Sequence, residues 1–429
     1  MIDPIILKGF RDSMPKEEMP KRKITETLEK GFQSYGFVPI DTPVLEYSSV
    51  LLGKGGGETD KQVFRFEDNG GREVAMRFDL TVPFARFMAA HSSELALPFK
   101  RYHINKVWRG EKPQKGRYRE FIQCDFDIVG VDNTQADYEI LSMMHHSFHL
   151  LGIERYSFHI SHRGMFNTFL EKLGVMEHST DILRAVDKLM KIGRDEVKSI
   201  LVDNIIHDEG KAEDILTYIT PAENAGFLER LEKLETLCGG SCPGSVRLRE
   251  IYNLLEATEI SDAFILDPSI TRGLDYYTGI VYETFLTDLP TLGSVCSGGR
   301  YNNLASLYTK ENLPGVGSSI GLDRLLAGLE ELKSPLLSNN SSADVMIIYR
   351  PEEIEKAEKA ARVLRDKGIR TDVYLSPEHK SKRIFDYADK NSIPYSLSFK
   401  ENTVALKCHK TRETKEYSNV SEAVEGIII

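Results

Sequence analysis

The chain has 429 residues, which is long enough for two or three domains. Hydrophobic residues make up 41% of it and charged residues 28%, as in ordinary globular proteins, and no apolar run is long enough to span a membrane. The net charge of −10 argues against nucleic-acid binding by the chain as a whole, and the amino terminus lacks the basic leader and apolar core of a secretory signal. We therefore expect a cytoplasmic protein.

The cysteines give no indication of a structural framework. Five of them lie at scattered positions, which favours reduced thiols over disulfides. Only Cys238 and Cys242 are close in sequence, and no second pair of metal ligands lies near them. We expect no metal site at this pair.

The hydrophobic pattern changes twice along the first 332 residues. Ile24, Leu28 and Phe32 recur at helical spacing and predict an amphipathic helix over 17–35. The pattern then indicates extended chain over 38–44 and strands over 73–81, 101–109, 121–129 and 280–286. Helical spacing returns between these strands, over 164–257, and we expect a helical insertion there.

The last part of the chain has its own organisation. Residues 333–342 are rich in Ser, Asn and Pro, which is typical of a linker. Short strands and helices alternate after it, with strands expected over 344–349, 370–375 and 395–399 and helices over 352–367 and 379–391. This alternation predicts a small α/β module.

Two of the predicted strands have one charged face and one apolar face, because side chains alternate across a strand. Over 76–81, the alternation places Arg77, Asp79 and Thr81 on one face. Over 121–129, it places Gln123, Asp125 and Asp127 together. Each face alone is compatible with a solvated sheet surface. Taken together, they suggest a floor of carboxylates and arginines that could hold an ammonium group and phosphates.

A basic hairpin follows the same logic. Between Lys100 and Arg119 there are eight Lys or Arg residues and one acid, Glu111. Arg109 at the base of the loop could neutralise a phosphate, and Phe121 could stack on a base. Charge alone would equally fit a solvated hairpin.

Two glycine-containing segments complete the pattern. RGLDYYTG (272–279) combines a cation, a carboxylate and two tyrosines between glycines, which suits a small zwitterion held beside a phosphate. GVGSSIGLDR (315–324) runs from a glycine-rich strand into a helix expected over 323–332, where Arg324 adds a cation. The second segment is not a Walker-type loop, since no Gly-Lys-Ser/Thr follows.

These segments together resemble the class II aminoacyl-tRNA synthetases, and specifically the histidyl-tRNA synthetase family, over nearly the whole chain. The opening turn of the family corresponds to KGFRD (8–12). Motif 1 corresponds to YGFVPIDTPVLE (35–46), motif 2 to WRGEKPQKGRYREF (108–121) and motif 3 to GVGSSIGLDRL (315–325). The two histidine-specific signatures correspond to RGLDYYTG (272–279) and SGGRYNNL (297–304). The two signatures are highly specific, whereas motifs 1 and 3 are loose patterns.

The resemblance implies an α+β fold. The catalytic core, 1–332, would contain an antiparallel sheet flanked by helices and a helical insertion at about 164–257. A linker, 333–342, and an α/β anticodon-binding domain, 343–429, would follow. The implied activity is the ATP-dependent conversion of L-histidine to histidyl-adenylate, with Mg2+ on the phosphates, and transfer to the 3′ end of tRNA(His). The protein would be a homodimer formed through the motif 1 region.

The resemblance also implies roles for individual residues. The catalytic residues would be Arg272 and Arg109, and ATP would be bound by Arg109, Glu111, Phe121 and Arg324. Histidine would be held at its ammonium by Asp79, Thr81 and Gln123, at its imidazole by Asp127 and Tyr277, and elsewhere by Tyr276, Arg272 and Tyr118. The tRNA acceptor end would lie near Lys112, Gln114 and Lys115.

The chain departs from the family pattern in several places. Asp79 and Asp127 stand where many bacterial members carry Glu, Gly110 follows the motif 2 arginine, and 398–410 lacks the usual glycine-bearing turn, which puts the anticodon contacts in question. Three alternatives remain: a regulatory paralogue that senses histidine, an RNA-binding protein built on an inactive core, and a synthetase for another amino acid. The retained Arg109, Arg324 and C-terminal module favour the histidine enzyme.

Overall fold

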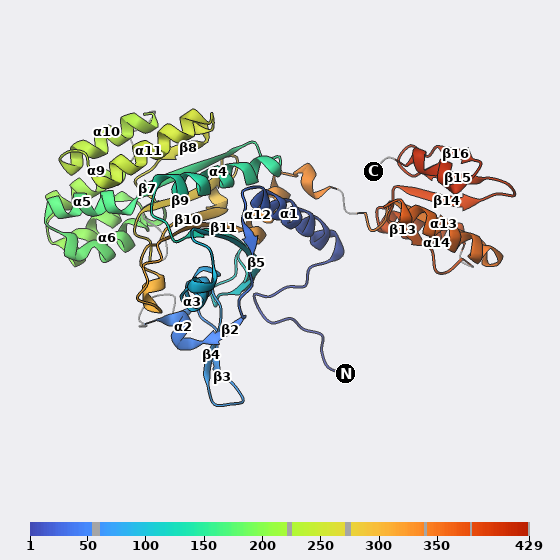
Figure 1. The fold of residues 1–429 in the computed structure, drawn as a ribbon, viewed down its shortest axis with the longest axis horizontal. Coiled ribbons are helices and arrows are strands. Elements are labelled where there is room, and N and C mark those ends of the chain that lie inside the picture. The colour runs from blue at the N-terminus through green and yellow to red at the C-terminus, as the bar shows by residue number, and fades with distance from the viewer. Residues whose placement is uncertain (54–60, 221–224, 271–275, 339–340, 378–379, 428–429) are drawn as a thin grey trace. The chain divides into compact units, whose positions relative to one another are not determined.

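The computed structural model describes residues 1–53, 61–220, 225–270, 276–338, 341–377 and 380–427 (Figure 1). The chain divides into two compact units. The first contains Met1–Ser13 and Lys21–Ser334, and the second contains Met14–Pro20 and Pro335–Ile429. Within the described residues, no helix has both the length and the apolar character needed to cross a membrane.

An eight-stranded sheet forms the centre of the first unit, with the strand order β1-β5-β6-β11-β10-β9-β7-β8. In that order the strands are Val38–Pro39, Phe99–Trp108, Glu120–Val129, Gly315–Gly321, Cys296–Arg300, Ile280–Leu286, Tyr156–His162 and Phe264–Leu266. The inner pairs are antiparallel, and the two edge pairs, β1–β5 and β7–β8, are parallel.

One face of this sheet is covered by helices α1 (Pro15–Ser34), α4 (Thr134–Leu150) and α12 (Leu322–Glu331). The predicted apolar stripe of α1 is buried, and the ring of Phe32 lies 4.9 Å from that of Phe126 on β6. Because side chains alternate on β6, the packing of Cys124, Phe126 and Ile128 under these helices leaves the polar residues of the strand on the opposite face. That face carries the candidate site.

The strand predicted over 73–81 is shorter than expected. It ends at Met76 as β4 (Glu73–Met76), in a small sheet with β2 (Leu45–Tyr47) and β3 (Arg65–Glu67). Thr81 instead begins helix α3 (Thr81–His91), which packs on the short helix α2 (Ser48–Leu52). The Asp79 carboxylate accepts a hydrogen bond of 3.0 Å from the amide of Val82 and so satisfies a donor of the first helical turn. The prediction that Arg77, Asp79 and Thr81 share one strand face was therefore wrong.

Helices occupy the chain between β7 and β8, where the sequence predicts them, and they form the green and yellow group in Figure 1. They include α5 (Arg163–Leu173), α6 (Ser179–Val186), α7 (Leu189–Ile192), α8 (Arg194–Ile200), η4 (Leu201–Ile206), α9 (Glu209–Ile219), α10 (Phe227–Cys238) and α11 (Pro243–Ala257). Helix α11 contacts α4, α5 and α10 and so connects this group to the sheet core.

The second unit contains a five-stranded sheet of order β13-β12-β14-β15-β16. The strands β12 (Val345–Ile348), β13 (Thr371–Val373) and β14 (Tyr395–Phe399) are parallel and alternate with helices α13 (Ile354–Asp366) and α14 (Ser381–Lys390), as the sequence predicts. The divergent tail adds an antiparallel hairpin, β15 (Val404–Cys408) and β16 (Thr414–Tyr417), followed by α15 (Val420–Ala423). The sequence analysis did not predict these last elements.

Candidate active site

The register of the large sheet brings polar residues from several strands onto one face. His103 on β5, Asp125 on β6, Ser319 on β11 and Ser297 on β10 stand directly opposite one another in turn, and the row continues to Glu283 on β9. The next row contains Arg101, Asp127, Gly317 and Gly299. Gln123, Asp125 and Asp127 thus share a face, as the alternation of β6 predicts.

Asp127 is held by two partners inside the sheet. Its Oδ2 lies 2.6 Å from Nη2 of Arg101, and its Oδ1 accepts a hydrogen bond from the Tyr301 hydroxyl. Burial raises the pKa of Asp127, while the charge of Arg101 and the bond from Tyr301 oppose that rise. A Cβ at Gly317 would overlap the Asp127 carboxylate, so only glycine fits opposite it. Arg101 itself is fully buried, with its guanidinium carbon 4.2 Å from the ring centre of Phe84.

Three tyrosines form an aromatic cluster beside Asp127. The ring centres of Tyr276 and Tyr277 are 4.9 Å apart, and those of Tyr276 and Tyr301 are 5.9 Å apart. Burial raises the pKa of Tyr277, and the neighbouring charge of Asp127 adds to the rise. A Cβ at Gly299 would lie 2.9 Å from Cδ1 of Tyr277, so the second glycine of SGGR makes room for this ring. These tyrosines remain protonated hydroxyls at neutral pH.

Asp79 and Asp125 are buried carboxylates with weakened acidity. Burial raises the pKa of Asp79 to about 6, opposed by the nearby Arg109 and Arg101. Burial also raises the pKa of Asp125 to about 7, where Arg101 opposes the rise and Asp127 adds to it. Thr81 donates a weak bond of 3.4 Å to Asp125. A cationic ligand would stabilise the charged form of both carboxylates.

Several polar atoms on this face or beside it have no hydrogen-bond partner among the residues that the structure describes. They are Asp79 Oδ2, Asp125 Oδ1, Gln123 Oε1, and Nε and Nη1 of Arg101. The amide nitrogen of Gln123 is already used, since it donates to Ser319 Oγ at 2.9 Å. Because buried polar groups are normally paired, three acceptors in one place favour a ligand that brings donors, such as an ammonium group.

Arginines gather next to this face. Arg109 donates from Nε to the carbonyl of Phe78 at 2.9 Å, and its guanidinium carbon lies 5.1 Å from the ring centre of Phe121. Arg324 donates from Nη1 to the carbonyl of Ser294 at 2.6 Å. Burial lowers the pKa of Arg324 to about 10, and the nearby charge of Arg117 adds to the fall. Neighbouring cations that lower one another's pKa favour the binding of a polyanion, such as a triphosphate.

A comparison with known proteins decides the family. The family model for histidyl-tRNA synthetase matches residues 9–325. The chain belongs to the histidyl-tRNA synthetase family. The histidine–tRNA ligase of Treponema denticola is 49% identical over 444 residues, covering 100% of this chain and 98% of the relative. That of Rhodopirellula baltica is 43% identical over 438 residues, with 100% and 98% covered. The crystal structure of histidyl-tRNA synthetase from Nostoc sp. PCC 7120 superposes with a TM-score of 0.87 at 28% identity, covering 100% of this chain and 99% of that one.

The family's opening segment, KGFRD, holds the motif 2 loop in place. Arg119 donates its amide to the carbonyl of Gly9 at 2.9 Å and a side-chain nitrogen to that of Lys8 at 3.2 Å. Arg11 lies over the Tyr118 ring at 4.2 Å and donates to Asp323 at 2.8 Å. The sequence analysis noted this segment without giving it a role, because no spacing connects it to residues so distant along the chain.

The remaining predicted site residues fall into three groups. Glu111 lies on the motif 2 loop with Oε2 3.7 Å from Arg117. Lys112 and Gln114 are exposed on that loop, and Lys115 forms an exposed ion pair of 2.7 Å with Glu331. Arg272 lies outside the described residues. The sequence analysis missed five residues with contacts at the site. Arg101 and Tyr301 hold Asp127, and Arg117 lies near Glu111 on the loop. Asp323 on α12 accepts from Arg11, and His103 stands opposite Asp125 and contacts Asp41.

Proposed function

We propose that this protein activates L-histidine with ATP and transfers the histidyl group to the 3′ end of tRNA(His). The observation that carries this proposal is a buried sheet face on which Asp125 and Gln123, together with the neighbouring Asp79, have unpaired acceptors, next to the arginines Arg109 and Arg324. Such a face suits an amino acid and a nucleotide side by side. Relatives of nearly equal length are histidine–tRNA ligases, which supports the same activity.

The imidazole would lie between Asp127 and Tyr277. A neutral imidazole has one donor and one acceptor nitrogen, so it needs an acceptor and a donor on opposite edges. Asp127, paired with Arg101, would accept from the ring N–H, and the protonated Tyr277 hydroxyl would donate to the other nitrogen. Asp79, Thr81 and Gln123 would take the ammonium group, with Tyr276 and Tyr118 enclosing the substrate.

ATP would occupy the arginine-rich side. Phe121 would stack on adenine, Glu111 would accept from the adenine amino group, and Arg109 would hold the α-phosphate. Arg324 would hold the distal phosphates, and Arg272 would lie between the histidine carboxylate and the α-phosphate. Mg2+ would enter as part of the nucleotide substrate and neutralise phosphate charge.

The chemical step asks little covalent work of the protein. A histidine carboxylate oxygen attacks the α-phosphorus, the bond to the β-phosphate oxygen breaks, and pyrophosphate leaves. Fixed cations that neutralise the phosphate charge and correct placement of the two substrates lower the barrier. A hydroxyl of the terminal tRNA adenosine then attacks the adenylate carbonyl, and AMP leaves.

The tRNA would meet the protein in two places. Lys112, Gln114 and Lys115 on the motif 2 loop would contact the acceptor end, and the second unit would read the anticodon. A homodimer through the motif 1 region is also proposed, since Val38, Val44 and Leu45 are exposed apolar residues of that segment. The proposed location is the cytoplasm.

A charging assay tests this function. The purified full-length protein is incubated with ATP, labelled histidine and a tRNA(His) transcript, and acid-precipitable label is counted. We expect histidine to be esterified to this transcript and not to a transcript that carries the recognition nucleotides of a different tRNA. Absence of charging by a folded protein that binds both histidine and ATP would contradict the proposal.

A further inference from the structure

The two site tyrosines are followed by a short segment that rests on the end of β10. Thr278 donates its amide to the carbonyl of Arg300 at 2.7 Å. The Thr278 hydroxyl in turn accepts from the amide of Asn302 at 3.1 Å. A Cβ at Gly279 would lie 3.0 Å from Cδ of Arg300, so this glycine lets the chain lie directly against the arginine. The backbone of Arg300 therefore sets where the chain leaves Tyr277.

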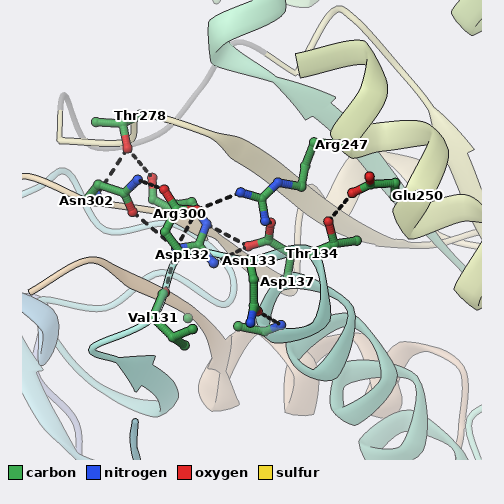
Figure 2. A network of polar contacts seen from close by, with 12 residues as sticks. Val131, Asp132, Asn133, Thr134, Asp137, Arg247, Glu250, Thr278, Arg300 and Asn302 are labelled. Carbon is green, nitrogen blue, oxygen red and sulfur yellow. Dashed lines mark hydrogen bonds and ion pairs between the residues drawn. The ribbon is translucent and has the colours of Figure 1, made fainter. Parts of the chain in front are cut away.

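The side chain of Arg300 runs from this contact to the start of helix α4. Its Nε donates to Oδ1 of Asp137 at 2.8 Å, and its Nη1 donates to the carbonyl of Val131 at 3.1 Å (Figure 2). Arg300 is 3% exposed and Asp137 is 1% exposed. A buried charge pair with several hydrogen bonds permits few other arrangements, so Arg300 is fixed relative to α4.

A second arginine, Arg247, reaches the same carboxylates from the helical insertion. From α11 it donates to Oδ1 of Asp132 at 2.7 Å and lies 3.4 Å from Oδ2 of Asp137. The other oxygen of Asp132 accepts from the Asn302 side chain at 2.8 Å. Figure 2 shows the two guanidinium groups converging on the two carboxylates, so the charges balance.

The insertion is also held closely against the core beside this network. A Cβ at Gly244, in the first turn of α11, would lie 2.7 Å from Nδ1 of His162 at the end of β7. The first turn of α11 therefore lies directly against the end of β7, and a shift of the helix would have to move Arg247 with it.

We propose that Arg300 and Arg247 are positioning residues for the histidine pocket. Arg300 holds the segment that carries Tyr276 and Tyr277, and Arg247 connects that hold to the helical insertion. The position of the helical insertion on the core thereby determines the affinity for histidine. This inference rests on the proposed function, because it takes Tyr277 as part of the histidine site.

The test uses Arg247→Ala in the full-length protein, with Arg249→Ala as the matched control. Arg249 lies on the same helix but pairs with Glu235 of α10 at 2.9 Å, within the insertion. Calorimetric titration with histidine alone measures Kd, and ATP–pyrophosphate exchange measures both KM values. We expect Arg247→Ala to raise Kd and KM for histidine about tenfold with KM for ATP unchanged. Arg247→Lys should recover part of the loss, and Arg249→Ala should match the parent.

A purely structural role would have a different signature. It would lower the melting temperature and the active fraction while leaving Kd for histidine unchanged, and that result overturns the inference. If Arg247→Ala fails to fold, Asp132→Asn replaces it, because this substitution weakens the bond to Arg247 while keeping the side-chain shape. We expect Asp132→Asn to raise Kd for histidine by a smaller factor. An unchanged Kd overturns the inference. These measurements also distinguish failure of the inference from failure of the proposed function. If the parent protein binds histidine but shows no exchange, activation is refuted. The Kd of the variant for histidine still decides the role of Arg247.

Discussion

The carboxylate of Asp127 fills the space that a side chain at position 317 would occupy. Gly317 stands directly opposite Asp127 in the β6–β11 pairing, and a Cβ there would overlap the carboxylate. In the proposed function, the glycine-rich strand of motif 3 would therefore serve the amino-acid site as well as the close approach of a nucleotide. It lets a charged residue lie flat on the sheet, between Arg101 and Tyr301.

Gly317→Ala should accordingly abolish histidine activation. We expect exchange activity to fall at least about a hundredfold, because Asp127 must move out of the histidine pocket. Gly321→Ala on the same strand is the matched control, since its Cβ would meet nothing closer than 3.7 Å. Exchange kinetics measure both variants. Equal activity of the two would show that Asp127 can move without loss of function.

Arg101→Met should destabilise the first unit. The substitution leaves the buried Asp127 carboxyl group without its cationic partner, and removal of one partner of a buried pair typically costs about 3–5 kcal/mol. Urea unfolding followed by the fluorescence of Trp108, the single tryptophan, measures this, because Trp108 is buried on the same strand. Arg72→Ala, which removes an exposed pair with Asp68 on the β3–β4 hairpin, should leave the midpoint unchanged. Similar midpoints for Arg101→Met and the parent would contradict the account of the buried pair.

Asp125→Asn should become more stable relative to the parent as the pH rises. The pKa of Asp125 is raised to about 7 in the folded protein from an ordinary 3.8, so the folded state holds the proton more tightly. Its contribution to stability is complete below about pH 4 and is lost as the pH rises through 7. Asparagine stays neutral. The free energy of unfolding of the variant should therefore rise by at least about 1 kcal/mol relative to that of the parent between pH 5 and pH 8.

The Trp108 signal also measures this pH effect, with Asp203→Asn at an exposed position of the insertion as the control. The difference between Asp203→Asn and the parent is the reference at each pH. A constant difference between Asp125→Asn and the parent would mean that Asp125 is ionised throughout that range.

The double variant Lys112→Ala, Gln114→Ala should separate the two steps of the reaction. Both residues are exposed on the motif 2 loop, so histidine activation should stay at the parent level. We expect kcat/KM for charging of tRNA(His) to fall about tenfold, because a cationic contact to the acceptor end is lost. Lys310→Ala removes an exposed cation outside this loop and serves as the control. A double variant with parental charging would move the acceptor-end site elsewhere.

Local patterns explain which features could be predicted from the sequence. The alternation on β6 lies within a single strand, and the stripe of Ile24, Leu28 and Phe32 lies within a single helix. Both patterns agree with the structure. The end of β4 at Met76 was missed because it depends on a hydrogen bond from Val82 to the Asp79 side chain, which a hydrophobic pattern does not contain.

Partners from distant segments could not be predicted either. Arg101 meets Asp127 only through the β5–β6 register, and Arg11 meets Asp323 across most of the chain. The β15–β16 hairpin was missed because its outer strand, Thr414–Tyr417, is polar and mostly exposed, so it lacks the apolar alternation of a half-buried strand.

ATP–pyrophosphate exchange with each of the standard amino acids tests the central claim most directly. In the proposed function, Asp127, Tyr277 and the unpaired acceptors around Asp79 would hold an amino acid with a two-nitrogen ring, and the neighbouring arginines would hold ATP. The account predicts exchange with histidine and with no other amino acid. Exchange with a different amino acid, or no exchange by a protein that binds histidine and ATP, would contradict it.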